Sequence, residues 1–185
     1  MLRFATTNEG KVREARARLG PDVTQLDYDY VEVQSDDLAE IAAAGAREAF
    51  DESEGTDPVV VDDSGLFIRA LDGFPGPYSA YVEDTLGVER VQRLVAAEDD
   101  ARASFRAVVA YADADRTETF SGRVGGRIVA PRGDGGFGYD PIFEHEGQTF
   151  AELGPEAKNA VSHRGRALDA LAEWLADVEP ATERP

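Results

Sequence analysis

The stretch DPVVVDDSGLFIRAL, residues 57–71, decides the fold class of this chain. Its three consecutive valines, residues 59–61, are β-branched and favour a strand. A short apolar run bounded by turn residues is typical of a strand that is buried on both faces of a sheet. Because Asp62, Asp63 and Ser64 follow directly, we predict a central strand that ends in a polar elbow.

Helical and extended patterns alternate on both sides of this strand. On the N-terminal side, the patterns predict strands at residues 2–6 and 23–26 and helices at 11–20 and 36–50. On the C-terminal side, they predict a loop at 72–80, a helix at 87–98, a hairpin of 104–114 with 118–129, a glycine-rich loop at 131–141, and a final helix capped by Ser162. The sequence therefore predicts one mixed α/β domain over residues 1–185, of which 177–185 form a frayed tail.

The charge balance excludes several classes of partner. The chain has 37 acidic residues against 19 Lys and Arg, a formal charge of -18. Such a surface repels nucleic-acid phosphates and anionic membranes, so we expect neither as a partner. With no cysteine, a disulfide, a thiolate nucleophile or a thiolate metal site is impossible. No apolar run reaches the ~20 residues of a membrane helix, and a halophilic, salt-rich cytoplasm would screen the self-repulsion.

The two lysines of the chain lie in two segments that resemble phosphate-binding helix starts. Lys11 belongs to TTNEGK, where a strand gives way to a helix whose N–H groups and dipole favour an anion. The alternative is that Thr7 or Asn8 only caps the helix and that Lys11 is solvated. Lys158 belongs to KNAVSHRG, residues 158–165, at the start of the final helix. Because the chain has lysine only in these two segments, we interpret Lys11 and Lys158 as phosphate-binding residues and not as simple surface charges.

Two further segments can carry chemistry. Paired carboxylates after a buried strand can hold Mg²⁺ or orient a water as general base, whereas a chance Asp-Asp pair would be a solvated turn. In GDGGFGYDP, residues 133–141, four glycines permit close approach of a ligand to the backbone. Phe137 and Tyr139 in this segment either stack on a flat ring or fold into the core.

Taken together and in order, ATTNEGKVREA, VVVDDSGLFIRALDGFPGPYSA, GGFGYDPIF and KNAVSHRGRAL resemble the inosine triphosphatase, or Ham1-like, family. Members of this family hydrolyse non-canonical purine nucleoside triphosphates such as ITP, dITP and XTP to the monophosphate and pyrophosphate. The resemblance implies an elongated α/β fold with a mixed central sheet and flanking helices, and two lobes around a substrate cleft. It also implies a homodimer and Mg²⁺ as cofactor. The cytoplasmic location is expected instead from the lack of an apolar run long enough for a membrane helix.

The resemblance also implies roles for particular residues. It assigns Asp63 as proton acceptor and metal ligand, Glu32 in VEVQS as a second metal ligand, and Ser64 as a substrate contact. The expected triphosphate contacts are Thr6, Thr7, Asn8 and Lys11; the expected base contacts are Phe137, Gly138, Tyr139, Asp140, Lys158, Ser162, His163 and Arg164. Two positions depart from the family pattern. A lysine of many relatives is missing from EIAAAGAREAF, where Arg47 could supply the contact, and Tyr139 stands where some relatives have tryptophan.

These roles give a mechanistic hypothesis. Asp63 would deprotonate a water that attacks the α-phosphorus. Hydrogen-bond donors of SHRG would donate to the 6-oxo group of hypoxanthine or xanthine, whereas the amino group of adenine would leave them unpaired. The residues alone leave open which of Asp62 and Asp63 takes the proton. Two alternatives remain, a pyrophosphatase for other modified nucleotides and a non-catalytic nucleotide-binding module.

Overall fold

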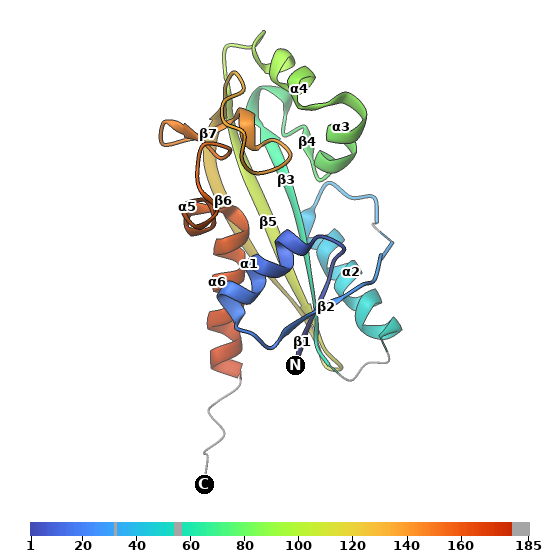
Figure 1. Cartoon of the computed structure of the whole chain (residues 1–185). Helices are drawn as coiled ribbons and strands as arrows, with labels where there is room; N and C mark the ends of the chain where they lie inside the picture. Colours follow the sequence, from blue (N-terminus) through green and yellow to red (C-terminus); the bar gives the residue numbers. More distant parts are fainter. Residues whose placement is uncertain (32, 54–56, 179–185) are drawn as a thin grey trace.

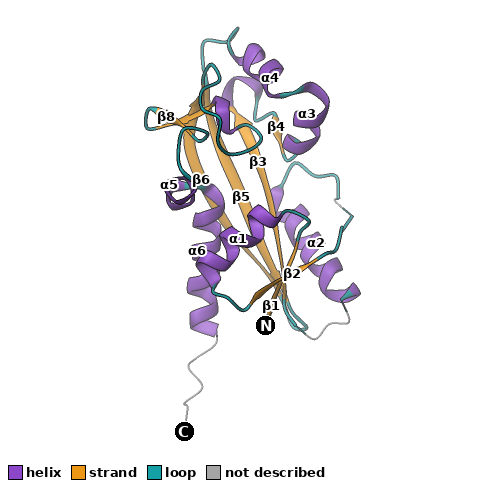
Figure 2. Cartoon of the chain, in the orientation of Figure 1, coloured by secondary structure: helices purple, strands orange, loops and turns teal. Residues whose placement is uncertain are grey.

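The computed structural model describes residues 1–31, 33–53 and 57–178. A mixed sheet of eight strands forms the centre of the molecule, in the order β2-β1-β3-β5-β6-β7-β8 with β4 paired to β3 (Figures 1 and 2). The strands are β1 (Leu2–Ala5), β2 (Val23–Leu26), β3 (Val59–Ile68), β4 (Pro75–Gly76), β5 (Arg102–Ala112), β6 (Thr117–Ile128), β7 (Phe143–His145) and β8 (Gln148–Thr149). The helices are α1 (Glu9–Leu19), α2 (Leu38–Glu52), α3 (Ser79–Leu86), α4 (Val88–Val95), α5 (Pro155–Val161) and α6 (His163–Val178). The predicted α/β class is confirmed.

The central strand differs from its prediction in one respect. β3 does not end in a polar elbow; it runs through Asp62, Asp63 and Ser64 to Ile68. The reason is its antiparallel partner β5, which pairs with it without interruption from Val59 opposite Ala112 to Ile68 opposite Ala103. The ladder of backbone hydrogen bonds keeps the polar residues extended, so their side chains alternate between the two faces of the sheet.

The other differences lie where the chain is short or irregular. The predicted helices α1, α2, α4 and α6 and the hairpin of β5 and β6 are present, and Asp113 N donates to Arg116 O (3.0 Å) in the predicted hairpin turn. The sequence patterns did not predict α3, which begins inside the expected loop, or α5, β7 and β8. Residues 177 and 178 belong to α6, and the rest of the predicted tail lies outside the described residues. No helix among the described residues is long and apolar enough to cross a membrane.

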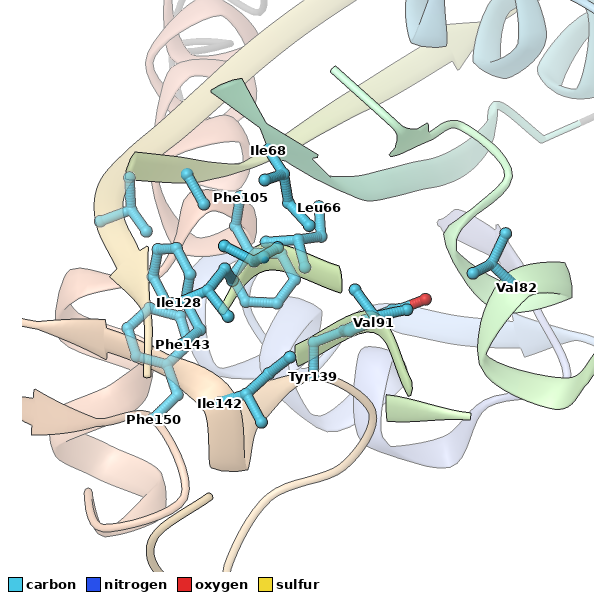
Figure 3. Close-up of a cluster of buried hydrophobic side chains, with 13 residues drawn as sticks. Leu66, Ile68, Val82, Val91, Phe105, Ile128, Tyr139, Ile142, Phe143 and Phe150 are labelled. Atoms are coloured by element: carbon cyan, nitrogen blue, oxygen red, sulfur yellow. The ribbon is translucent and has the colours of Figure 1, made fainter. Parts of the chain in front are cut away.

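Three buried clusters pack on the sheet and define two lobes. In the lower lobe of Figure 1, α1 and α6 cover one face and α2 covers the other. In the upper lobe, side chains from α3, α4, β7 and the short 3-10 helix η2 (Asp140–Ile142) pack on the same face as α1 and α6. Figure 3 shows the centre of this upper cluster, where Phe105 of β5 meets Phe143 (ring centroids 4.6 Å apart) and Phe150 (5.7 Å). The side chains alternate strictly along β3 and β5, so each strand contributes to both faces.

Candidate active site

A gap in strand pairing creates the site. On one edge of β3, β1 pairs only with Val59 and Val60, and β4 pairs only with Leu66 and Phe67. Between these contacts, residues 62–65 have no strand partner on this edge among the described residues. A cavity of about 430 Å³ opens there, at the carboxyl end of β1. In open α/β sheets, ligands bind at such strand ends, where neighbouring connections diverge.

A buried carboxylate between two cations forms the floor of this cavity. Asp62 is 3% exposed, and its Oδ2 accepts from Arg164 Nε (2.7 Å) and lies 3.1 Å from Lys11 Nζ. Lys11 Nζ also donates to the backbone oxygen of Asp62 (2.9 Å). Burial acts to raise the pKa of Asp62, but the charges and hydrogen bonds of Arg164 and Lys11 outweigh it and hold that pKa well below its usual range. Neither Asp62 nor Lys11 is therefore a solvated surface group.

Arg164 ties the start of α6 to β3 and α1. Its side chain is 4% exposed, and besides Asp62 it donates from Nη1 to Glu14 Oε2 (3.1 Å) and from Nη2 to Ser64 Oγ (3.3 Å). A guanidinium presents donors in a rigid fork, which suits three partners on different elements. Among the described residues the guanidinium of Arg164 binds side chains of β3 and α1, and so it fixes the shape of the cavity wall.

Asp63 has a different environment from its neighbour. Because β3 continues through both residues, Asp63 projects to the face opposite Asp62. It is partly exposed, lines the cavity, and its Oδ1 accepts from the backbone N of Ser64 (2.9 Å). Of the two adjacent carboxylates, Asp62 is therefore held by two cations, and Asp63 forms part of the cavity wall.

The glycine-rich loop and α5 form the other end of the cavity. Lys158 Nζ lies 2.5 Å from Asp140 Oδ2, and both residues are buried. Asp140 Oδ2 also accepts from Phe137 N (2.8 Å), which fixes the loop. Lys158 Nζ lies 4.3 Å from the centroid of the Phe137 ring, and Phe137 is 52% exposed. This end of the cavity therefore presents an open aromatic face beside a lysine.

The two aromatic residues of this loop have different environments. Phe137 faces the cavity, whereas Tyr139 is 3% exposed, packs in the upper cluster of Figure 3, and donates from its hydroxyl to Ser79 O (2.9 Å). Tyr139 therefore folds into the core, whereas stacking of Phe137 on a flat ring stays a prediction. Tyr139 still forms part of the cavity wall, together with Gly138.

The junction of α5 and α6 brings a buried histidine to the cavity. Ser162 Oγ accepts from Gly165 N (2.9 Å), which confirms Ser162 as the cap of α6. The ring of His163 stacks on Phe105 at 4.8 Å between centroids, and its Nδ1 has no hydrogen-bond partner among the described residues. Burial, and then the charge of Arg164, hold the pKa of His163 well below its usual value. The neutral ring has one donor and one acceptor nitrogen.

The N-terminal segment is also at the cavity. Thr6, Thr7 and Asn8 all line it, and Asn8 caps α1 by accepting from Gly10 N (2.8 Å) and Lys11 N (3.3 Å). The capping alternative is therefore correct for Asn8. Arg47 does not replace the missing lysine. It donates to Asp113 O (2.7 Å), is not among the residues of the cavity wall, and pairs with Asp51. The predicted metal ligand Glu32 lies outside the described residues.

The structure adds a wall that sequence patterns did not predict. Tyr28, Asp29 and Tyr30 line the cavity, and α2 holds them in place. Glu48 Oε1 accepts from the Tyr28 hydroxyl (2.9 Å) and from Val31 N (3.2 Å). At Gly45, a Cβ would lie 2.5 Å from a ring carbon of Tyr30. We call residues 28–31 the strap, because they lie over α2 and close one side of the cavity.

Other wall residues were also missed. Glu14, Glu83 and Phe105 line the cavity. Glu14 had a weak signal, since its position three residues after Lys11 places both on one face of a helix. Glu83 and Phe105 gave none, because only the packing of α3 and β5 brings them to the cavity.

Comparison with known proteins identifies the family. The model of the Ham1 family matches residues 2–174. The chain belongs to this family. A dITP/XTP pyrophosphatase of Methanopyrus kandleri is 55% identical over 92% of this chain and 94% of its own length, and one of Thermococcus kodakarensis is 49% identical over 94% and 96%. The structure of the Staphylococcus aureus Ham1 protein superimposes with a TM-score of 0.85 at 31% identity, covering 97% of this chain and all of that one.

Proposed function

We propose that this Ham1-family chain hydrolyses non-canonical purine nucleoside triphosphates, namely ITP, dITP and XTP, to the monophosphate and pyrophosphate. The observation that carries the proposal is a single cavity with two unlike ends. One end has Lys11 and the start of α1, and the other has Phe137 beside Lys158. Cations and helix N–H groups suit a triphosphate, and an open aromatic face suits a purine ring.

Asp63 is the proposed general base. A carboxylate that already accepts from two cations is a weak proton acceptor, which removes Asp62 from the role. Asp63 lines the same cavity, where its Oδ1 accepts from the backbone N of Ser64, and we infer that it orients a water toward the α-phosphorus. The water oxygen bonds to phosphorus, its proton passes to Asp63, and the bond to the pyrophosphate oxygen breaks. This placement favours, on physical grounds, the assignment that the resemblance implied.

The carboxylates of the site fit a magnesium ion. Asp62 Oδ1 is buried without a hydrogen-bond partner among the described residues, and Asp62 and Asp63 both line the cavity although their side chains leave β3 on opposite faces. Enzymes that act on phosphates bind Mg²⁺ through one or two carboxylates together with substrate phosphate oxygens. Asp63 and Glu32, the ligands that the resemblance implied, would hold it. The ion would neutralise charge on the phosphates.

Base selection falls to the junction of α5 and α6. Ser162, His163 and Lys158 line this part of the cavity, and the neutral ring of His163 offers a single N–H donor. A donor in this position pairs with a 6-oxo group and would meet the amino group of adenine as a second donor. Because Arg164 is bound to Asp62, Glu14 and Ser64, we assign it a positioning role ahead of a base contact.

A substrate panel tests the proposal. The full chain is incubated with ITP, XTP, dITP, ATP and GTP, with and without Mg²⁺, and pyrophosphate and monophosphate are quantified. We expect Mg²⁺-dependent release of pyrophosphate with ITP, dITP and XTP far above ATP and GTP. Equal rates on all five contradict the base selection, and a preference for modified pyrimidine triphosphates favours the alternative pyrophosphatase. Tight binding without turnover favours the non-catalytic module. The homodimer and the cytoplasmic location are part of the proposal, and sedimentation tests the first.

A further inference from the structure

The upper half of one sheet face, which is one quarter of the total sheet surface, is not covered by an apolar cluster of the described residues. The upper cluster covers one face of the upper lobe, while α2 covers the opposite face only in the lower lobe. By alternation, the rest of that face carries Phe67 of β3, Ser104 and Arg106 of β5, and Arg123 of β6. A cavity of about 700 Å³ lies over these residues, and it shares no wall residue with the proposed active site.

Arginines face one another across this quarter. The register of β5 and β6 places Arg106 opposite Arg123 and Arg102 opposite Arg127. Like charges directly opposite on antiparallel strands destabilise the pair. Arg102 pairs with Asp100 (2.7 Å). Within the described parts of the chain, Arg106, Arg123 and Arg127 form no ion pair, although the protein carries 37 acidic residues.

Arg106 is held in place beside its like-charged neighbour. Its guanidinium carbon lies 4.1 Å from the centroid of the Phe67 ring, and its Nε donates to the buried Ser104 (3.3 Å). Burial, and then the charge of Arg123, lower the pKa of Arg106. Arg106 and Arg123 are both exposed, and an anion bound between two facing guanidinium groups would offset their repulsion.

We propose that Arg106 and Arg123 form a second binding site, in which a polyvalent phosphate anion bridges the two guanidinium groups. The donor fork of arginine matches phosphate oxygens, and two such forks favour a ligand with more than one negative charge. Pyrophosphate and orthophosphate share the required chemistry.

Titration calorimetry of the full chain with pyrophosphate tests the site. Because pyrophosphate also fits the proposed active site, we expect two binding events in the wild type. In Arg123→Gln and Arg106→Gln one event weakens by about tenfold or more, as expected for a lost hydrogen bond to a charged group. The matched control is Arg93→Gln, an exposed arginine of α4, which should keep both events. Orthophosphate in place of pyrophosphate shows which of the two anions binds more tightly.

Stability gives an independent readout. In low-salt buffer without phosphate, Arg123→Gln should raise the melting temperature because it removes the repulsion, whereas Arg123→Lys keeps the charge and should not. Pyrophosphate should then raise the melting temperature of the wild type more than that of Arg123→Gln, with sodium chloride at equal ionic strength as reference. Circular dichroism confirms that each variant is folded.

Three results overturn the proposal. The first is unchanged pyrophosphate binding in both glutamine variants. The second is a rise in melting temperature with sodium chloride that equals the rise with pyrophosphate. The third is a change of molecular mass in Arg123→Gln with pyrophosphate binding intact, which identifies the face as a subunit interface. Hydrolysis is a separate readout, since neither arginine lines the proposed active site. A chain without pyrophosphatase activity would still bind the anion here.

Discussion

At the scale of single residues, the proposed active site depends on the contrast between two adjacent carboxylates. Asp62 is buried and held by Arg164 and Lys11, while Asp63 faces the opposite side of β3 and reaches the cavity. The strand thus places two residues of the same type in different environments, and two cations hold the pKa of Asp62 well below its usual range. Substitution should separate a structural role from a chemical one.

Asp63→Asn should lower kcat on ITP by about 10²- to 10⁴-fold, the range expected for a lost general base. Amide and carboxylate are close in size, so the change in KM should be small. Pyrophosphate release under saturating substrate measures kcat, with circular dichroism as the control for folding. Turnover close to that of the wild type would show that another group takes the proton.

Asp62→Asn should act mainly on stability. The substitution removes one of the two carboxylates that pair with Arg164, whose side chain is 4% exposed, and breaking a buried pair costs up to roughly 3–5 kcal/mol. Urea unfolding measures the difference in free energy. Asp100→Asn is the matched control, because Asp100 pairs with the exposed Arg102 and should lose much less. Equal losses in the two variants would contradict the special position of Asp62.

His163 should make the stability depend on pH. Its pKa is lowered in the folded protein, whereas the unfolded chain binds a proton near pH 6.5. The unfolded state therefore holds more protons below that pH, and the free energy of unfolding should fall as the pH drops from 7.5 to 5.5. Urea midpoints across this window measure the slope. His163→Asn should flatten it and His145→Asn should not; identical slopes in all three proteins would argue against this origin.

At the scale of elements, the strap can lie against α2 and form one wall of the cavity because Gly45 of α2 has no side chain. Glycine inside a helix costs about 1 kcal/mol relative to alanine, so Gly45 has a packing reason. That reason is the ring of Tyr30, which occupies the space where a Cβ would lie. Glu48 then fixes the strap through Tyr28 and Val31.

Gly45→Ala should therefore destabilise the protein and raise KM, because the strap must move. In a Tyr30→Ala background the same substitution should become neutral or stabilising, since the clash is gone and the better helix former remains. Chemical denaturation of the four proteins of this cycle, with KM for each, measures the coupling. Additive effects would mean that Gly45 and Tyr30 act independently.

At the scale of the whole molecule, the charge of -18 should govern the response to salt. Self-repulsion between exposed carboxylates weakens as the Debye length shortens, from about 10 Å at 0.1 M to about 3 Å at 1 M. The melting temperature should therefore rise with KCl. A scanning calorimetry series in KCl, repeated in NaCl, separates screening from an effect of one cation. A melting temperature independent of salt would remove the argument for a salt-rich habitat.

The sequence by itself determined the class of the fold, the long elements and most of the candidate site. Hydrophobic periodicity and turn residues are local properties, and they were sufficient for β3, β5, β6 and the longer helices. The four motifs carried the resemblance to the Ham1 family, and the site residues that they named lie together around one cavity, apart from Glu32, which is outside the described residues.

Only the tertiary structure decided how these residues divide the work. The pairing of β5 along all of β3 turned an expected elbow into a strand, and this sets Asp62 and Asp63 on opposite faces. The short elements α3 and α5 and the strap have too few residues for a periodic signal. The arginines of β5 and β6 face one another because of the strand register, which depends on both strands and cannot be predicted from either sequence segment alone. Local patterns select elements, whereas contacts between distant segments fix which charges meet.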